Sequence, residues 1–326
     1  MEINKEIYLN KKLHNIVIIS YNRCDLTIQC IESIYGTLGI SDFIITVVDN
    51  GSSDNTRQEI EKKYPKINLI KNLENLGYSK AVNIGVKSVN SDYALVINND
   101  VIFHAGSIEM LLNYIQAEGA VGAVGPQQEY PNGKWQYSFS SVPGAWLGLK
   151  NLLLINSFFT ILRKLFYNTY RIDNRPKRVG YIDGAVLLIR NIAFNEVDGF
   201  DEDYFFYAEE ADFCYRLRQA GWKVIFNPRS IVTHLRGGTT TNYYLQEKDL
   251  QMLISGKFLF CLKHLTYTST RLYYRFELIH YSIIKYFWKI LLKVLIGRLK
   301  KRVEQKLIYF KTYIKLWQEE YIRTIS

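Results

Sequence analysis

The sequence predicts an α/β protein, in which helices flank a mostly parallel sheet and a basic helical extension follows at the C-terminus. Three observations predict this fold class. Short apolar runs rich in β-branched residues alternate with segments of helical periodicity. Several of these runs end abruptly in polar residues, as buried strands do when they open onto a site. Positive charge is concentrated from Lys257 onward, where 15 Lys and Arg residues outnumber four acids.

The first part of the chain is expected to contain four strands, each followed by a helix. Val and Ile dominate the strands, and helical spacing of apolar residues marks the segments between them. Strands that alternate with helices in this way run parallel and are joined by right-handed crossovers. The expected strands are 15–20, 43–48, 67–70 and 93–97, and the expected helices are 26–38, 56–63, 77–86 and 106–116.

The later part of the chain is less regular. Residues 145–170 are expected to be helical, and this helix either packs in a core or faces a membrane. Another helix is expected to open at Glu209 and to end at Gly221. The glycines on either side of Asp183 indicate a close approach of the backbone to another group. Short strands are expected at 135–139, 224–226 and 231–233.

Several classes of protein are not supported by the sequence. The four cysteines are far apart and form no C-x-x-C pair, which predicts reduced cytosolic thiols rather than a zinc site or a disulfide framework. The polar N-terminus does not resemble a signal peptide, and lysines interrupt the longest apolar runs, so no membrane-spanning segment is expected. Dinucleotide, P-loop and G-x-S-x-G motifs are absent. The basic tail indicates an anionic partner, either a membrane or a nucleic acid.

Polar residues follow three of the predicted strands. Asn22, Asp49 and Asp100 should converge, because the carboxyl ends of parallel strands share one edge of a sheet. Asp100 ends the sequence Asn98-Asn99-Asp100, and a carboxylate with amides beside it suits a hard divalent cation shared with a diphosphate. The alternative is a simple turn that leaves the strand.

A second group of candidate residues lies further along the chain. Glu209, Glu210 and Asp212 open a predicted helix beside several Tyr and Phe residues. A carboxylate in such a pocket can act as a general base, and the alternative is a solvated acidic face. His234 directly follows the last predicted strand, where it is either a metal ligand or a histidine satisfied by structural hydrogen bonds.

Five segments together resemble the inverting family 2 glycosyltransferases of the GT-A fold, in their order and spacing as well as in their residues. The similarity is greatest to the rhamnosyltransferase-like branch, which builds bacterial surface polysaccharide, and it covers roughly Asn15 to Thr240. The five segments are 16–23, 47–56, 75–85, 96–100, and 199–202 running into 209–212.

The resemblance implies a nucleotide-sugar site at the edge of the sheet. Asp49 would accept the imide N–H of uracil or thymine, which cytosine and purines do not offer in the same place. Asp100 would hold Mg²⁺ or Mn²⁺ on the donor diphosphate, although Asn98 replaces the first Asp of the family's D-x-D motif and so weakens metal affinity. The donor-site residues that the resemblance implies besides Asp49 are Ser20, Tyr21 and Asn22 at the nucleotide, Asn75, Gly77, Ala81 and Asn83 around the ribose and sugar, and Asn98 and Asn99. Asp183, which glycines flank, is a further candidate for this site.

The resemblance also implies the catalytic groups. Glu210 falls where the family has its base, an Asp, and it would deprotonate the acceptor hydroxyl in a single displacement that inverts the anomeric carbon. Because Glu is one methylene longer than Asp, Glu209 or Asp212 could be the base instead. His234 matches the family's late histidine, which contacts the metal or the diphosphate.

The resulting expectation is an inverting glycosyltransferase that uses a dTDP- or UDP-sugar, with dTDP-L-rhamnose as the expected donor and a lipid-linked bacterial glycan as acceptor. Residues 1–256 would form the catalytic domain, with a nucleotide-sugar half up to about 125 and an acceptor half from about 126. Residues 257–326 would form amphipathic helices that hold the enzyme on the inner face of the cell membrane, with no nucleic acid as partner. The alternatives for this tail are a helical bundle that packs on the catalytic domain and a dimer interface. The alternatives are a catalytically weak nucleotide-sugar-binding homologue and a basic nucleic-acid-binding protein.

Overall fold

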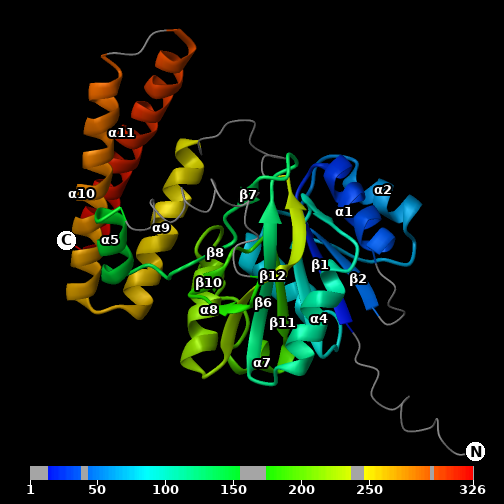
Figure 1. Cartoon of the computed structure of the whole chain (residues 1–326). Coiled ribbons are helices and arrows are strands. Elements are labelled where there is room, and N and C mark those ends of the chain that lie inside the picture. The colour runs from blue at the N-terminus through cyan, green and yellow to red at the C-terminus, as the bar shows by residue number, and fades with distance from the viewer. Residues whose placement is uncertain (1–13, 38–42, 155–173, 236–245, 294–296, 326) are drawn as a thin grey trace, which may run out of the picture. The chain divides into compact units, whose positions relative to one another are not determined.

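The computed structural model describes residues 14–37, 43–154, 174–235, 246–293 and 297–325 (Figure 1). These residues divide into two units, which are described separately. The N-terminal unit contains 14–140, 174–205 and 209–235, and the C-terminal unit contains 141–154, 206–208 and 246–325. The predicted boundary between residues 256 and 257 falls inside one helix, α9 (Glu247–His264).

The N-terminal unit is built on a sheet whose main path runs in the order β3-β2-β1-β4-β11-β6-β12-β5. Strands β3, β2, β1 and β4 pair in parallel, as do β6 and β12. Along this path β11 and β5 are antiparallel to their neighbours. The structure therefore confirms the predicted mostly parallel sheet. The strands are β1 (His14–Ser20), β2 (Phe43–Asp49), β3 (Asn68–Lys71), β4 (Tyr93–Asn98), β5 (Val101–Phe103), β6 (Val121–Glu129), β11 (Val186–Arg190) and β12 (Lys223–His234).

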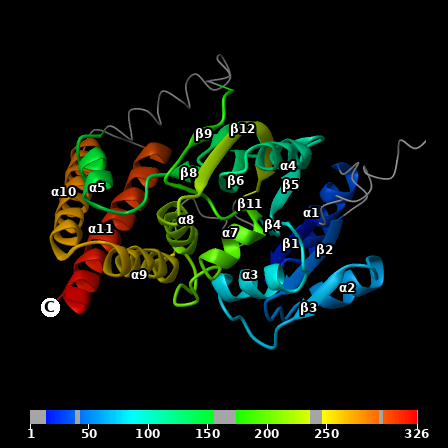
Figure 2. The same ribbon diagram turned by 90° about the horizontal axis from the view of Figure 1, so that it is seen from below.

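Helices cover both faces of the sheet. Successive side chains of a strand point to opposite faces, so each buried strand contributes apolar side chains to a core on either side. Ile16 and Ile18 of β1 pack in one core with helices α1 (Cys24–Thr37), α2 (Thr56–Lys63) and α4 (Ser107–Ala117). Val17 and Ile19 point the other way and pack in a second core. That core is closed by α3 (Tyr78–Lys87), α7 (Asn191–Glu196) and α8 (Glu209–Gln219). Figure 2 shows α1 and α4 on one side of the strands and α3 and α7 on the other.

Several elements differ from the sequence prediction. The two short strands expected at 224–226 and 231–233 are halves of β12, which continues past a register shift between Asn227 and Ile231. The strand expected at 135–139 is divided: β7 (Trp135–Gln136) pairs with β6, and β8 (Phe139–Ser140) pairs with β10 (Tyr181–Ile182) in a second sheet. The remaining short strand, β9 (Lys177–Arg178), pairs with β12.

The helix expected at 145–170 is described only in its first part. Helix α5 (Ala145–Leu152) ends before Leu154, whose left-handed backbone (φ 57°) does not continue a helix. Residues 155–170 lie outside the described residues.

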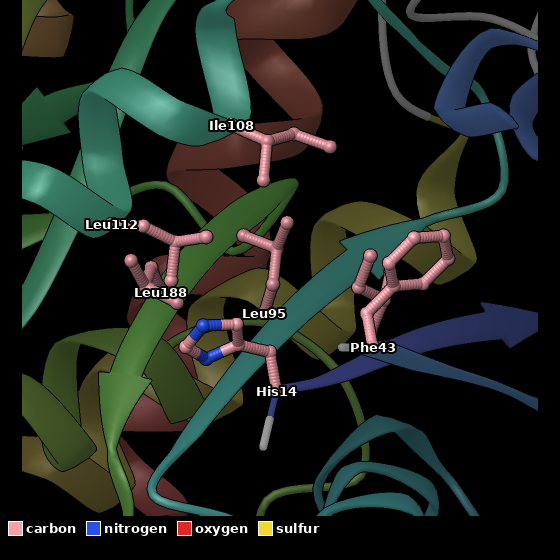
Figure 3. A pocket seen from close by; sticks show the side chains of 7 residues that line it. His14, Phe43, Leu95, Ile108, Leu112 and Leu188 are labelled. Atoms are coloured by element: carbon pink, nitrogen blue, oxygen red, sulfur yellow. The ribbon is translucent and has the colours of Figure 1, made fainter. Parts of the chain in front are cut away.

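A small cavity of about 10 Å³ lies between α4 and the sheet, and Figure 3 shows the side chains that surround it. Ile108 and Leu112 line it from the helix, while His14 and Phe43 line it from the first residues of β1 and β2. Its position at the amino ends of these strands places it at the opposite edge from the predicted site, and its lining is almost entirely apolar. We interpret it as a packing defect of the core rather than a substrate site.

The C-terminal unit is helical. It contains α5, α9, α10 (Tyr267–Leu291) and α11 (Gly297–Ile325), and Figure 1 shows α10 and α11 side by side. Its core is unusually aromatic: Trp317 of α11 packs against Phe258 of α9 and against Tyr273 of α10. Part of the aromatic content of the tail thus stabilises a helical bundle. No helix in the described residues has the length and apolar character needed to cross a bilayer.

Candidate active site

The loops that follow β1, β2 and β4 meet at one edge of the sheet. The backbone N–H of Asn22 donates to Ser52 Oγ (2.8 Å), and Asn22 Oδ1 accepts from the backbone N–H of Ser53 (2.9 Å). Asn99 Nδ2 donates to the carbonyl oxygen of Asn22 (3.3 Å) and to Thr27 Oγ1 (3.0 Å). Asn22 therefore joins the other two loops, and its left-handed backbone (φ 56°) lets it do so.

Asp49 is completely buried at the end of β2. Its Oδ2 forms an ion pair with Arg57 Nε and accepts from the backbone N–H of Ser52 (3.4 Å). Arg57 is held in turn by the carbonyl oxygen of Asn72 (2.6 Å). The other oxygen, Asp49 Oδ1, has no hydrogen-bond partner among the described residues. A buried carboxylate oxygen without a partner is costly unless a ligand supplies the donor.

A hydrogen-bond network fixes the entrance to α3. Asn75 Oδ1 accepts from Asn50 Nδ2 (3.0 Å) and from the backbone N–H of Gly77 (2.9 Å). Gly77 has a left-handed backbone (φ +84°), and a Cβ there would lie 2.8 Å from the carbonyl oxygen of Phe205. Only glycine fits this position without displacing the neighbouring chain.

Several predicted donor-site residues support the site from behind rather than facing solvent. Ser20 is buried and its Oγ lies 2.9 Å from Thr27 Oγ1, and Ala81 is buried in the core. Asn83 is also buried, and it ties the loop before α8 to α3 through both backbone groups of Phe200 (2.8 Å each). Tyr21, by contrast, is exposed.

Four side chains from separate parts of the sequence form one continuous chain of polar contacts. Asp100 Oδ1 lies 3.2 Å from His234 Nε2, and His234 Nδ1 lies 3.0 Å from Gln128 Oε1. Gln128 Nε2 donates to Asp183 Oδ1 (3.4 Å). Because the amide of Gln128 points its nitrogen at Asp183, its oxygen accepts the proton of His234 Nδ1. In the neutral imidazole, the lone pair of Nε2 therefore faces Asp100.

This geometry fits a divalent cation. Two neighbouring ligands of a six-coordinate ion with bonds of about 2.1 Å lie about 3 Å apart, close to the observed separation of Asp100 Oδ1 and His234 Nε2. Metal-binding histidines usually donate a hydrogen bond from the nitrogen that does not bind the metal, which fixes the orientation of the ring. No group of three or more His, Cys, Asp or Glu residues is placed to hold a metal within the described residues. Diphosphate oxygens and water would have to complete the coordination.

The remaining residues of the Asn98-Asn99-Asp100 sequence have structural contacts. The backbone N–H of Asn98 donates to the carbonyl oxygen of Ala185 (3.0 Å), which anchors the end of β4 to the chain just before β11. The amide nitrogen of Asn99 is engaged by the loop after β1, as described above. Asp100 is thus the carboxylate of this sequence that reaches His234.

The three acids that open α8 have different environments. Burial, and next the negative charge of Glu210, raise the pKa of Glu209 well above its ordinary value. Asp212 is completely buried and is paired with Arg216 Nη2 (2.6 Å), one helical turn away. Arg216 in turn donates to the carbonyl oxygen of Gly199 (2.8 Å). Glu210 is only partly buried.

Tyr78 lies between Glu210 of α8 and the chain segment that carries Asp183 and Gly184. Its hydroxyl donates to the carbonyl oxygen of Gly184 (2.7 Å). A Cβ built at Gly184 would lie 3.7 Å from that hydroxyl and 3.8 Å from Glu210 Cβ. Burial, and then the charges of surrounding carboxylates, raise the pKa of Tyr78 well above its ordinary value; in order of effect, these are Glu209, Glu210, Asp183 and Asp100.

Sequence reasoning missed Gln128 and Tyr78. Gln128 carries the same signal that pointed to Asp100, since it is a polar residue near the carboxyl end of an apolar strand. Tyr78 directly follows Gly77 at the start of α3, and the sequence offers no sign that its hydroxyl reaches Gly184. The structure brings together Asp100, His234, Asp183 and Glu210, and it separately joins Asp49 to the loops that hold Asn22 and Asn75.

Comparisons with known proteins identify the family and the fold. The family model described as glycosyl transferase family 2 matches residues 15–197. The chain is 32% identical over 207 residues to N-acetylglucosaminyl-diphospho-decaprenol L-rhamnosyltransferase of Mycobacterium tuberculosis, which covers 60% of this chain and 67% of the relative. It is 26% identical over 156 residues to rhamnosyltransferase WbbL of Escherichia coli, covering 45% of this chain and 54% of the relative.

Two solved structures share the fold. The mannosyltransferase PcManGT from Pyrobaculum calidifontis, in complex with GDP-Man and Mn²⁺, superposes with a TM-score of 0.56 at 12% identity, over 96% of this chain and 86% of that one. GalNAc-T7 with UDP, GalNAc and Mn²⁺ superposes with a TM-score of 0.54 at 12% identity, over 78% of this chain and 51% of that one. The sheet, the site at its edge and the matched family model lead to one conclusion: the chain belongs to glycosyltransferase family 2, has the GT-A fold, and has rhamnosyltransferases among its relatives.

Proposed function

We propose that this protein transfers a deoxyhexose from a dTDP- or UDP-sugar, with dTDP-L-rhamnose as the donor, to a lipid-linked glycan, and that the anomeric configuration inverts. The relatives named above support the sugar and the kind of acceptor, since one acts on a decaprenol-linked N-acetylglucosamine diphosphate according to its name. The residues of the site support the reaction class, and each assignment below can be tested separately.

The choice of nucleotide rests on Asp49. Its Oδ1 is a buried acceptor that lacks a partner in the described structure, while Arg57 and Ser52 hold Oδ2. The imide N–H of thymine or uracil supplies a donor that this oxygen needs, whereas the corresponding ring nitrogen of cytosine is itself an acceptor. The charge on the carboxylate strengthens the bond and so increases discrimination against the wrong base.

The proposed position of the diphosphate is inferred from Asp100 and His234. In this proposal the two residues hold Mg²⁺ or Mn²⁺, and the metal stabilises the charge on the departing nucleoside diphosphate. Gln128 keeps the proton of His234 on Nδ1, so that Nε2 is available as a ligand. Asp183, which accepts from both Gln128 and the backbone N–H of Ala185, fixes the orientation of the Gln128 amide.

Glu210 is the residue best suited to act as the base. Burial raises the pKa of Glu209 well above its ordinary value and so favours its protonated form, and Asp212 is paired with Arg216. The acceptor hydroxyl passes its proton to Glu210 as its oxygen bonds to the anomeric carbon. The bond from that carbon to the diphosphate breaks, its electron pair leaves with the nucleoside diphosphate, and the configuration inverts.

The single observation that carries the proposal is the continuous chain of contacts from Asp100 through His234 and Gln128 to Asp183, together with Glu210, whose Cβ lies 3.8 Å from a Cβ built at the adjacent Gly184. These groups lie far apart in the sequence, and in this proposal a metal-bound diphosphate and an acceptor hydroxyl meet between them.

The test measures nucleoside diphosphate release from a panel of dTDP-, UDP- and GDP-sugars, with a polyprenyl-diphosphate glycan as acceptor and Mg²⁺ or Mn²⁺ added. Glu210→Gln and Asp100→Ala should each lower kcat at least a hundredfold. The matched control is Glu61→Gln, which removes an acid from the exposed surface of α2. Full activity in both site variants would remove the assignment, and thermal stabilisation by donor without turnover would indicate a binding protein instead.

A further inference from the structure

Helix α10 carries a stripe of exposed large apolar side chains, and we call it the α10 stripe. At 100° per residue, its six members fall within about 100° of the helix circumference. The exposed fraction of each side chain is 39% or more. The six residues are Leu272, Ile279, Ile283, Tyr286, Phe287 and Ile290.

The α10 stripe is not the face that holds the helical unit together. Tyr273, Glu277 and His280 lie on the adjacent face of α10 and are buried. Tyr281 packs against Tyr313 of α11, with ring centroids 4.0 Å apart and the ring planes tilted by 33°. Because this inner face already packs α10 against its neighbours, the stripe is left over as a continuous apolar surface, and such surfaces mark interaction sites.

The charges around the stripe all have one sign. Arg275 and Lys289 are exposed and follow one edge of the stripe, and Lys293 is exposed in the turn just after the end of α10. The sequence of α10 contains one acidic residue, Glu277, and this is buried and accepts from Asn151 Nδ2 (2.7 Å). A partner that fits this surface must be apolar where the stripe lies and anionic beside it.

We infer that α10 lies on the surface of an anionic lipid bilayer, with the stripe buried at the level of the headgroups and acyl chains and with Arg275, Lys289 and Lys293 against lipid phosphates. Helices with one apolar face and a basic border bind membranes in this way. This inference does not depend on the proposed reaction or on any residue of the active site.

The other candidate partners fit the surface less well. A nucleic acid would be attracted to the lysines, but its phosphate backbone offers nothing to bury the stripe. A second copy of the chain packing stripe to stripe would bring two sets of like charges together, which is unfavourable. A lipid surface satisfies both features at once, and each basic residue near an anionic leaflet strengthens its binding.

The first experiment compares full-length variants in flotation with vesicles of 30% phosphatidylglycerol and 70% phosphatidylcholine. We expect Ile283→Ser/Phe287→Ser to weaken vesicle binding about tenfold, because two apolar side chains no longer enter the bilayer. The matched control is Ile192→Ser on α7 of the N-terminal unit, where the isoleucine is 66% exposed compared with 52% for Ile283. This control should bind as the unchanged protein does.

The second experiment tests the charges. Lys289→Gln/Lys293→Gln should weaken binding to the phosphatidylglycerol vesicles at least tenfold, at about fivefold for each lysine, and should leave binding to pure phosphatidylcholine vesicles unchanged. All these positions are exposed, so the variants should keep the melting temperature of the unchanged protein. Equal flotation of all variants would overturn the inference. So would a loss of dimers in the stripe variant without a change in flotation, since that would identify the stripe as an interface between copies.

Discussion

Asp100 and His234 face each other across the junction of two antiparallel strands, with Asp100 Oδ1 3.2 Å from His234 Nε2. The pairing of β5 with β12 creates this contact, because it places His234 opposite Val101, the residue directly after Asp100. The carbonyl oxygen of Asp100 also accepts from the backbone N–H of Leu235 (2.9 Å), so main-chain hydrogen bonds fix both partners. A metal would therefore find two ligands already oriented, which lowers the entropic cost of binding it.

Gln128 should determine how strongly the metal is held. Gln128→Leu removes the acceptor for His234 Nδ1 and the donor to Asp183, so His234 loses its fixed tautomer and orientation. Changes to such partners of metal ligands typically cost 10–100-fold in metal affinity or activity. We expect the Mn²⁺ concentration for half-maximal activity to rise by a factor in that range, as measured by titrating Mn²⁺ into the donor-hydrolysis assay.

The control for Gln128→Leu is Gln116→Leu, which makes the same change at an exposed position near the end of α4. A purely structural role for Gln128 would lower kcat or the melting temperature while leaving the Mn²⁺ dependence the same. That result would separate Gln128 from the metal site.

Asp49 should determine which nucleotide base is accepted. In Asp49→Asn the side chain loses its charge, and its amide nitrogen can occupy the position of Oδ1, where it would oppose the imide N–H rather than accept from it. A hydrogen bond to a charged group contributes about 1.5–3 kcal/mol, so the Kd of dTDP should rise about 10–100-fold. The Kd of CDP should change little or fall. Isothermal titration calorimetry with both nucleotides measures the ratio, and an unchanged ratio would show that Asp49 does not read the base.

Much of the fold could be predicted from the sequence, because local patterns determine it. The apolar runs that became β1, β2 and β4 begin and end within one residue of their expected positions. The convergence of the loops holding Asn22 and Asn99 follows from parallel pairing alone, since it places the carboxyl ends of neighbouring strands together. These features need no knowledge of the distant parts of the chain.

The rest depends on pairings between distant segments, which periodicity does not reveal. Nothing in the sequence indicates that β11 inserts antiparallel between β4 and β6, yet this insertion helps bring Asp183 to Gln128. The different environments of the α8 acids are also long-range effects, except for the pairing of Asp212 with Arg216, whose spacing of four residues is visible in the sequence.

Gly77 should be intolerant of any side chain. A Cβ at this left-handed position would lie 2.8 Å from the carbonyl oxygen of Phe205, so Gly77→Ala must displace the loop before α8 or the start of α3. We expect a loss of about 1–3 kcal/mol in the free energy of unfolding and weaker donor binding. Urea denaturation and a donor titration measure the two effects. The matched control, Gly119→Ala, adds the same methyl group where no atom of the described structure lies within 4 Å, and comparable losses in both variants would refute the steric explanation.

Glu209 should make the protein less stable as the pH rises. Its pKa in the folded state is raised, chiefly by burial and then by Glu210, so the folded protein keeps a proton that the unfolded chain releases above about pH 4.5. Below that pH Glu209 is protonated in both the folded and the unfolded state, so its ionisation does not change the free energy of unfolding. As the pH increases toward the folded-state pKa, the unfolded state is favoured by about 1.4 kcal/mol per pH unit.

Glu209→Gln carries no titrating proton, so its stability relative to the unchanged protein should increase between pH 5 and pH 7. Urea denaturation at several pH values measures this difference, with Glu61→Gln as the exposed control. Parallel pH profiles for the unchanged protein and Glu209→Gln would mean that Glu209 is ionised in the folded state, and the choice of Glu210 as the base would then lose one of its supports.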